Sequence, residues 1–171
     1  AAPNGCEVPS HNADIAAKDW PEVEKGFAQM MQIIDKQVGD LVAYLEKEGL
    51  ADNTIIMFAS DNGPHQEGGH KVDFFDSNAD LRGKKRDMWG GIRTPFIVKW
   101  PGKVKAGSTS NHLSAFWDVL PTFCDIAKVE KPAGIDGLSL LPTLLGDTAK
   151  QEKHKYLYFE FYEEGGKQAG G

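Results

Sequence analysis

The sequence lacks a long apolar run, and it has little cysteine. Crossing a bilayer takes roughly 20 consecutive apolar residues, and no stretch of the 171 residues approaches that length, so no membrane partner is predicted. Residues 1–5 have neither a basic start nor an apolar segment. If the protein is exported, we therefore expect its signal peptide to lie upstream or to have been removed. Two cysteines, Cys6 and Cys124, leave a disulfide open, but the apolar pattern around Cys124 favours a buried thiol.

Positive charge is also in short supply. The chain has 19 Lys and Arg against 25 Asp and Glu, a formal net charge of −6 at pH 7. Such a surface repels phosphate backbones, so we expect no nucleic acid partner. The hydrophobic share of 40% and the charged share of 26% are typical of a globular domain, and the length fits one domain rather than two.

The pattern of apolar residues predicts a layered α/β protein. An amphipathic helix is predicted to begin near Asp19 and Pro21 and to end at Gly49, because apolar residues recur every three or four positions between them. Strands are predicted at 53–59, 95–100 and 156–162, and the first of them has the near-continuous apolar run of a strand buried on both faces. A helix over 113–129, which Pro121 kinks or splits, is predicted between the last two strands. Three strands make a small sheet for this α/β order. We therefore expect residues 1–171 to form a single partial domain, with a leading loop over 1–18.

The loop after the first strand is the first candidate site, since ligands of open α/β sheets collect beyond the carboxyl ends of strands. Asp61 and Asn62 offer two hard oxygen donors there, which suit Ca²⁺ or Mg²⁺. The same residues followed by Gly63-Pro64 are also ordinary turn formers. Spacing alone leaves both interpretations open.

A cationic segment follows at 81–87, with Lys84 and Lys85 at its centre. Clustered cations beside a metal site suit an anionic substrate, although a solvated basic loop has the same composition. His65 and His70 lie in the intervening loop, where a histidine is more often polar surface than catalyst. No serine has the glycine context of a nucleophile elbow, and no glycine-rich phosphate loop opens a helix.

Taken together and in order, the motifs resemble the sulfatase family of the alkaline-phosphatase superfamily over nearly the whole chain. The matching segments are the helix end and DNT at 38–54, FASDNGP at 58–64, DFFDSN at 73–78, LRGKKRD at 81–87, GGIRTP at 90–95, WPGK at 100–103, WDVLPT at 117–122 and IDGLSL at 135–140. Each segment alone is a weak signal, and their shared order is a strong one. The resemblance implies part of an alkaline-phosphatase-like α/β/α sandwich, incomplete without an N-terminal half.

The resemblance also implies site residues and chemistry. It makes Asp61 and Asn62 ligands of a divalent cation, usually Ca²⁺ with Mg²⁺ as the alternative, and it makes Lys85 the contact to the sulfate. His65 follows the SDNGP motif, where a substrate contact is expected. The family nucleophile is a formylglycine made from Cys or Ser in Cys-x-Pro-x-Arg, and the segment beginning at Cys6 has the wrong spacing and no Arg. We expect that motif upstream, so this chain alone should be inactive and bind metal weakly.

One departure concerns the loop after Lys85: the family reads Tyr-Glu-Gly-Gly where this chain reads Trp89-Gly90-Gly91, so a glutamate is absent. The substrate expected from the resemblance is an aryl or carbohydrate sulfate, including sulfated glycans, in a periplasmic or exported enzyme. Two alternatives remain: a phosphomonoesterase or phosphonate hydrolase of the same superfamily, and a non-catalytic module that binds sulfated glycans. Missing sheet neighbours should leave an exposed apolar surface that favours oligomers.

Overall fold

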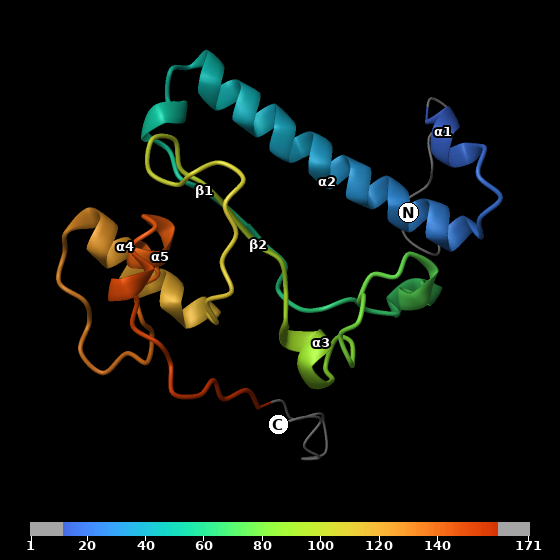
Figure 1. Cartoon of the computed structure of the whole chain (residues 1–171). Helices are drawn as coiled ribbons and strands as arrows, with labels where there is room; N and C mark the ends of the chain where they lie inside the picture. The colour runs from blue at the N-terminus through green and yellow to red at the C-terminus, as the bar shows by residue number, and fades with distance from the viewer. Residues whose placement is uncertain (1–11, 161–171) are drawn as a thin grey trace. The chain divides into compact units, whose positions relative to one another are not determined.

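The computed structural model describes residues 12–160, and the chain divides into two units (Figure 1). Unit 1 contains the described residues up to Ala51 together with Phe58–Ile97 and Glu160. Unit 2 contains Asp52–Met57 and Val98–Phe159. The segment that begins at Cys6 lies outside the described residues.

The long helix α2, Glu22–Lys47, confirms the predicted amphipathic helix. It begins one residue after Pro21, and its first turn has no side-chain cap. It ends where Gly49 takes a positive φ of 67°, a conformation that glycine adopts without steric cost. Among residues 12–160, no helix is both long enough and apolar enough to cross a membrane.

A short helix, α1 (Ala13–Ala16), lies within the stretch predicted to be a loop. The side chain of Asn12 accepts a hydrogen bond from the backbone N–H of Ile15, which caps the first turn. Ile15 is buried, and Asn12 also bonds to Gln29 and Gln32 of α2. These tertiary contacts, rather than apolar periodicity, explain a helix that the local pattern does not predict.

Burial along α2 is uneven. Glu24, Gly26 and Gln29 are buried near its beginning. Further along, several large apolar side chains are exposed, namely Met31, Ile33, Ile34, Leu41 and Tyr44. The exposed apolar surface expected from missing neighbours is therefore present on α2. Association through that surface stays a prediction.

Strands β1 (Ile56–Ala59) and β2 (Phe96–Lys99) are hydrogen-bonded neighbours in a two-stranded sheet. They confirm the first two predicted strands, each within its predicted range. The third predicted strand is wrong over 156–160, where the structure has no strand, and 161–162 lie outside the described residues. A strand is defined by a regular ladder of hydrogen bonds to a neighbouring strand, and the described residues 156–160 form no such ladder.

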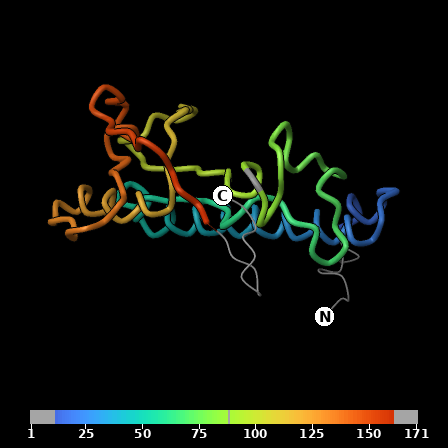
Figure 2. Tube along the Cα trace, turned by 90° about the horizontal axis from the view of Figure 1, so that it is seen from below, coloured from blue at the N-terminus to red at the C-terminus, as the bar shows by residue number. Residues whose placement is uncertain are grey.

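The stretch of unit 1 between the strands is irregular. It contains η2 (Glu67–Gly69), η3 (Val72–Phe74) and the short helix α3 (Met88–Ile92). Both views show the loop around η2 and η3 beside the beginning of α2 (Figures 1 and 2), and the buried contact between Glu24 and His70 joins them. This loop therefore has a fixed anchor on the long helix.

Unit 2 contains η1 (Ala51–Asn53, shared with unit 1), η4 (Phe116–Asp118), α4 (Val119–Ala127), α5 (Leu141–Leu144) and η5 (Thr148–Lys150). The helix predicted over 113–129 is shorter than expected, because a 3₁₀ turn precedes α4. Pro121 causes no kink: it lies in the first turn of α4, where a backbone N–H has no partner within the helix. Cys124 is a buried free thiol, as its apolar pattern predicted.

The organising residue of unit 2 is Asp118, whose side chain is fully buried. One carboxylate oxygen accepts the backbone N–H of Ala115 at 2.8 Å. The other accepts the N–H of Leu138 at 2.8 Å and lies 2.8 Å from Nε2 of His154. A single carboxylate thus joins segments 20 and 36 residues apart in the chain.

Candidate active site in unit 1

Asp61 and Asn62 lie in the loop that follows β1, one residue beyond its end, as the sequence predicted. The hydroxyl of Ser60 donates to the backbone oxygen of Asn62 at 2.9 Å, and the amide nitrogen Nδ2 of Asn62 donates to the backbone oxygen of Gly63 at 2.8 Å. These bonds orient the Asn62 amide so that Oδ1 is left to accept. The carboxylate of Asp61 is exposed. Two oxygen donors are therefore presented on consecutive residues.

The oxygen atoms of Asp61 and Asn62 are of the type that a hard divalent cation prefers, but two of them are too few to complete its coordination shell. Ca²⁺ takes six to eight oxygen ligands and Mg²⁺ takes six. Among the described residues, no group of three or more His, Cys, Asp or Glu side chains is placed to hold a metal ion. Asp61 and Asn62 can therefore supply part of a coordination shell whose other ligands must come from elsewhere.

The glycines of the GGIR motif hold this loop by close backbone packing. The N–H of Gly63 donates to the backbone oxygen of Gly91 at 2.8 Å. A Cβ on Gly63 would lie 1.9 Å from the oxygen of Gly90, and a Cβ on Gly91 would lie 2.2 Å from the oxygen of Lys84. Any side chain at these positions would push the two loops apart.

The same packing brings Lys85 to the loop after β1. The backbone N–H of Lys85 donates to the oxygen of Pro64 at 2.8 Å, and the N–H of Gly90 donates to the oxygen of Arg82 at 2.6 Å. The loop that lacks the family's glutamate is thus closed by main-chain bonds. Residues 61–62 and 85 are brought into one region of unit 1.

The ammonium group of Lys85 is paired with Glu67. Its Nζ lies 2.8 Å and 3.0 Å from the two carboxylate oxygens of Glu67. The hydrogen bond from Lys85 holds the pKa of the Glu67 carboxyl below its usual value. Glu67 was not among the site residues predicted from the sequence, although an acidic residue two positions after His65 was the available signal.

His65 lies beside the same pair. Its Nδ1 accepts the backbone N–H of Glu67 at 3.0 Å and lies 3.8 Å from a carboxylate oxygen of that residue. When the ring is neutral, an accepting Nδ1 places the proton on Nε2. The side chain is 36% exposed, so Nε2–H can donate to an oxygen of a bound molecule.

His70, five residues later, has a different environment. Its ring is 3% exposed, lies 2.5 Å through Nδ1 from a carboxylate oxygen of Glu24, and stacks on Phe27 at 3.8 Å between centroids. The other oxygen of Glu24 accepts the N–H of Lys71 at 2.9 Å. These contacts make His70 an anchor of the loop that carries His65 and Glu67.

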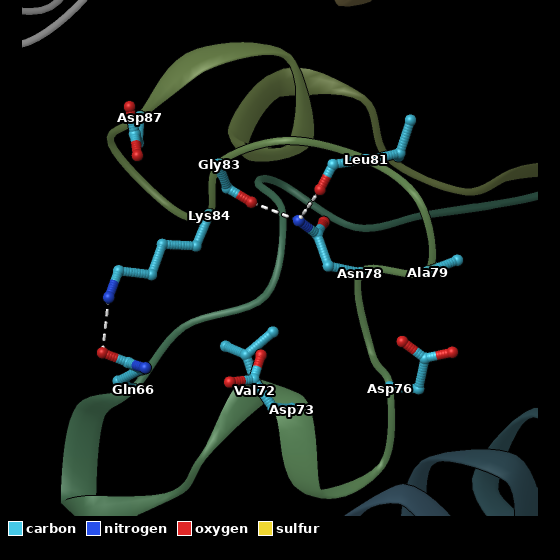
Figure 3. Close-up of a pocket in the computed structure, with 10 residues that line it drawn as sticks. All are labelled: Gln66, Val72, Asp73, Asp76, Asn78, Ala79, Leu81, Gly83, Lys84 and Asp87. Carbon is cyan, nitrogen blue, oxygen red and sulfur yellow. Dashed lines mark hydrogen bonds between the residues drawn. The ribbon is translucent and has the colours of Figure 1, made fainter.

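A cavity of about 340 Å³ lies nearby in unit 1 (Figure 3). Its lining includes Lys84, whose Nζ donates to the side-chain oxygen of Gln66 at 2.5 Å, and the carboxylates of Asp73, Asp76 and Asp87. Neither Lys85 nor the Asp61-Asn62 pair lines it. The predicted site therefore lies outside the lining of this cavity.

Comparison with protein families gives a match to the sulfatase family model over residues 8–129. The steryl-sulfatase of Rattus norvegicus is 37% identical over 155 residues, covering 86% of this chain and 27% of that protein. The N-acetylglucosamine-6-O-sulfatase of Bacteroides thetaiotaomicron is 40% identical over 132 residues, covering 76% of this chain and 22% of that protein. The chain thus spans about a quarter of the length of these relatives.

Comparison with solved structures supports the same grouping. A protein crystallised with its substrate D-glucosamine-2-N,6-O-disulfate matches with a TM-score of 0.66 and 33% identity. The match covers 84% of this chain and 27% of that one. The fold of the described residues is therefore part of a larger alkaline-phosphatase-like α/β architecture, as the sequence predicted.

Proposed function

The chain belongs to the sulfatase family, and from that premise we propose that the protein hydrolyses sulfate esters. The observation that carries the proposal is the close packing of Gly63, Gly90 and Gly91, which brings Lys85 next to the Asp61-Asn62 loop. Oxygen donors and a cation in one region of an exposed surface suit a small anion. A sulfate group is such an anion.

Each site residue has a separate part in the proposal. Asp61 and Asn62 would hold a divalent cation, Ca²⁺ or Mg²⁺, through their side-chain oxygens. When bound, this cation would supply positive charge to the sulfate oxygens. Lys85 would donate hydrogen bonds to the same sulfate, and His65 would contact the alcohol portion of the substrate through Nε2–H.

The reaction transfers a sulfuryl group from an alcohol to water, so the ester S–O bond breaks and the alcohol oxygen gains a proton. Negative charge develops on the oxygen of the leaving alcohol and on the sulfate oxygens as this bond breaks. The ammonium group of Lys85 stabilises that charge, because a cation already beside the sulfate needs little reorientation during the reaction. We propose that a formylglycine nucleophile and the remaining cation ligands come from outside these 171 residues.

The proposed substrates are carbohydrate sulfates in an exported or periplasmic enzyme. Support comes from two relatives, one named as an N-acetylglucosamine-6-O-sulfatase and one crystallised with a sulfated glucosamine. A steryl-sulfatase is also among the relatives, so both substrate types belong in the test.

The test is to express the complete reading frame and assay release of sulfate from an aryl sulfate, glucosamine 6-sulfate and a steryl sulfate. A phosphate monoester serves as the comparison substrate. We expect hydrolysis of sulfate esters that stops on chelation and returns with Ca²⁺ or Mg²⁺, and no turnover by the 171-residue chain alone. Hydrolysis of the phosphate ester without any sulfate release would reject the proposal.

A further inference from the structure

Two neighbouring lysines in unit 1 have different partners. Lys84 donates to the neutral side chain of Gln66, and Lys85 pairs with the carboxylate of Glu67. Only the second contact neutralises a charge. The lysine that the family resemblance assigns to the sulfate is therefore already paired with an internal anion.

The ion pair between Lys85 and Glu67 is exposed and weak, so Lys85 can exchange Glu67 for another anion. Glu67 is 58% exposed and Lys85 is 26% exposed, and an ion pair in contact with water contributes only about 0.2–1 kcal/mol. A sulfate group brought to Lys85 would face the like charge of the Glu67 carboxylate. One of the two anions must then give way, and Glu67 is the side chain free to turn into solvent.

The displaced carboxylate would remain close to the bound molecule. Its backbone N–H is held by Nδ1 of His65 at 3.0 Å, so the residue stays beside the site while its side chain turns. An ionised carboxylate can only accept hydrogen bonds. It therefore suits a substrate with a hydroxyl or amino group next to its sulfate ester.

We propose that Glu67 is a specificity-determining residue that exchanges partners. Without substrate it is the counter-ion of Lys85, and with substrate it accepts a hydrogen bond from the sugar group adjacent to the sulfate. This inference rests on the proposed sulfatase function. It assigns Glu67 a role in choosing carbohydrate sulfates over sulfate esters that lack a neighbouring donor.

The experiment uses the complete enzyme with Glu67→Ala, Glu67→Gln and the neighbouring control Gln66→Ala. Two quantities are measured: the inhibition constant of inorganic sulfate, and kcat/KM for glucosamine 6-sulfate relative to an aryl sulfate. Loss of one exposed ion pair should make sulfate inhibit Glu67→Ala about two- to fivefold more strongly. The same variant loses a hydrogen bond between the substrate and a charged group, so its ratio of kcat/KM for glucosamine 6-sulfate over the aryl sulfate should fall by about 10- to 100-fold.

Glu67→Gln should also bind sulfate more tightly, but it should keep part of the sugar preference because the amide oxygen still accepts. A purely structural role would weaken sulfate binding and leave the substrate ratio unchanged. The inference would be overturned if a folded Glu67→Gln variant bound sulfate more weakly or kept an unchanged substrate ratio. It would also be overturned if Gln66→Ala changed sulfate inhibition and the substrate ratio as much as Glu67→Ala does. Absence of sulfatase activity in the unmodified enzyme would instead reject the proposed function itself.

Discussion

Asp61 in unit 1 and Asp118 in unit 2 are both aspartates within motifs of the same family, yet their surroundings are opposite. Asp118 is fully buried, and its two oxygens receive bonds from Ala115, Leu138 and His154. Asp61 is exposed and follows a strand whose loop is held by the main chain. A buried carboxylate whose oxygens accept hydrogen bonds from the protein stabilises the fold, whereas an exposed carboxylate is accessible to a ligand.

The histidines of unit 1 repeat this contrast within one loop. His70 is buried against Glu24 and Phe27, and His65 lies beside Glu67, the partner of Lys85. Proximity in sequence thus gives no indication of shared role. Burial and partners separate the anchor from the residue available to substrate.

The largest effect is expected from Lys85→Ala in the complete enzyme. Removing one preorganised charge from the transition state should lower kcat about 10²- to 10³-fold, measured by sulfate release under saturating substrate. Lys84→Ala is the matched control, because Lys84 pairs with neutral Gln66. Equal losses in the two variants would remove the distinction between the lysines.

Asp118→Ala should have the largest effect on stability. It would leave the half-buried N–H groups of Ala115 and Leu138 without their acceptor, at a cost of about 1–3 kcal/mol in the free energy of unfolding. Denaturant titration of the 171-residue chain measures this cost. Asp125→Ala is the control, since Asp125 pairs with Lys131 in a partly exposed ion pair and should cost less than about 1 kcal/mol. Similar costs would contradict the structural role of Asp118.

A glycine pair tests the packing behind the site. Gly63→Ala places a Cβ 1.9 Å from the oxygen of Gly90, so we expect a loss of about 1–3 kcal/mol in stability and reduced activity of the complete enzyme. Gly39→Ala in α2 meets nothing within 4 Å and should stabilise the chain by about 0.5–1 kcal/mol. Denaturation midpoints of the two variants should move in opposite directions. A neutral Gly63→Ala would show that the two loops are not closely packed.

The smallest effect is a pH dependence in unit 2. Burial lowers the pKa of His112, with Asp118 opposing the shift and His154 and Lys153 adding to it. A lowered pKa means that the unfolded chain binds the proton more readily, so the neutral ring stabilises the fold above pH 6.5. That contribution is lost as the pH falls below 6.5.

Unfolding free energies of the 171-residue chain at pH 8 and pH 5.5 check this sign. The chain should lose more stability on acidification than His112→Gln, in which the titrating ring is gone. A larger loss of unfolding free energy in His112→Gln than in the unmodified chain would contradict a lowered pKa of His112.

Much of the fold could be predicted from the sequence where local rules apply. The helix α2 follows from its apolar periodicity, and β1 and β2 follow from apolar runs ended by turn residues. The strand expected at 156–160 fails because pairing depends on a neighbour that no local pattern supplies. The helix α1 was missed because its support comes from Asn12 contacts to α2.

The sequence by itself determined the family and the loop after β1, because ordered motifs are a property of the linear chain, and it predicts Asp61 and Asn62 as the oxygen donors of that loop. Only the tertiary structure decided two side-chain contacts between residues that are distant in sequence. Glu67 pairs with Lys85, 18 residues later in the chain, and Glu24 contacts His70, 46 residues later. The tertiary structure also placed the backbone of Gly90 against Gly63, so closely that no side chain fits. Such pairings depend on how the chain returns on itself, and residue types alone do not specify that path.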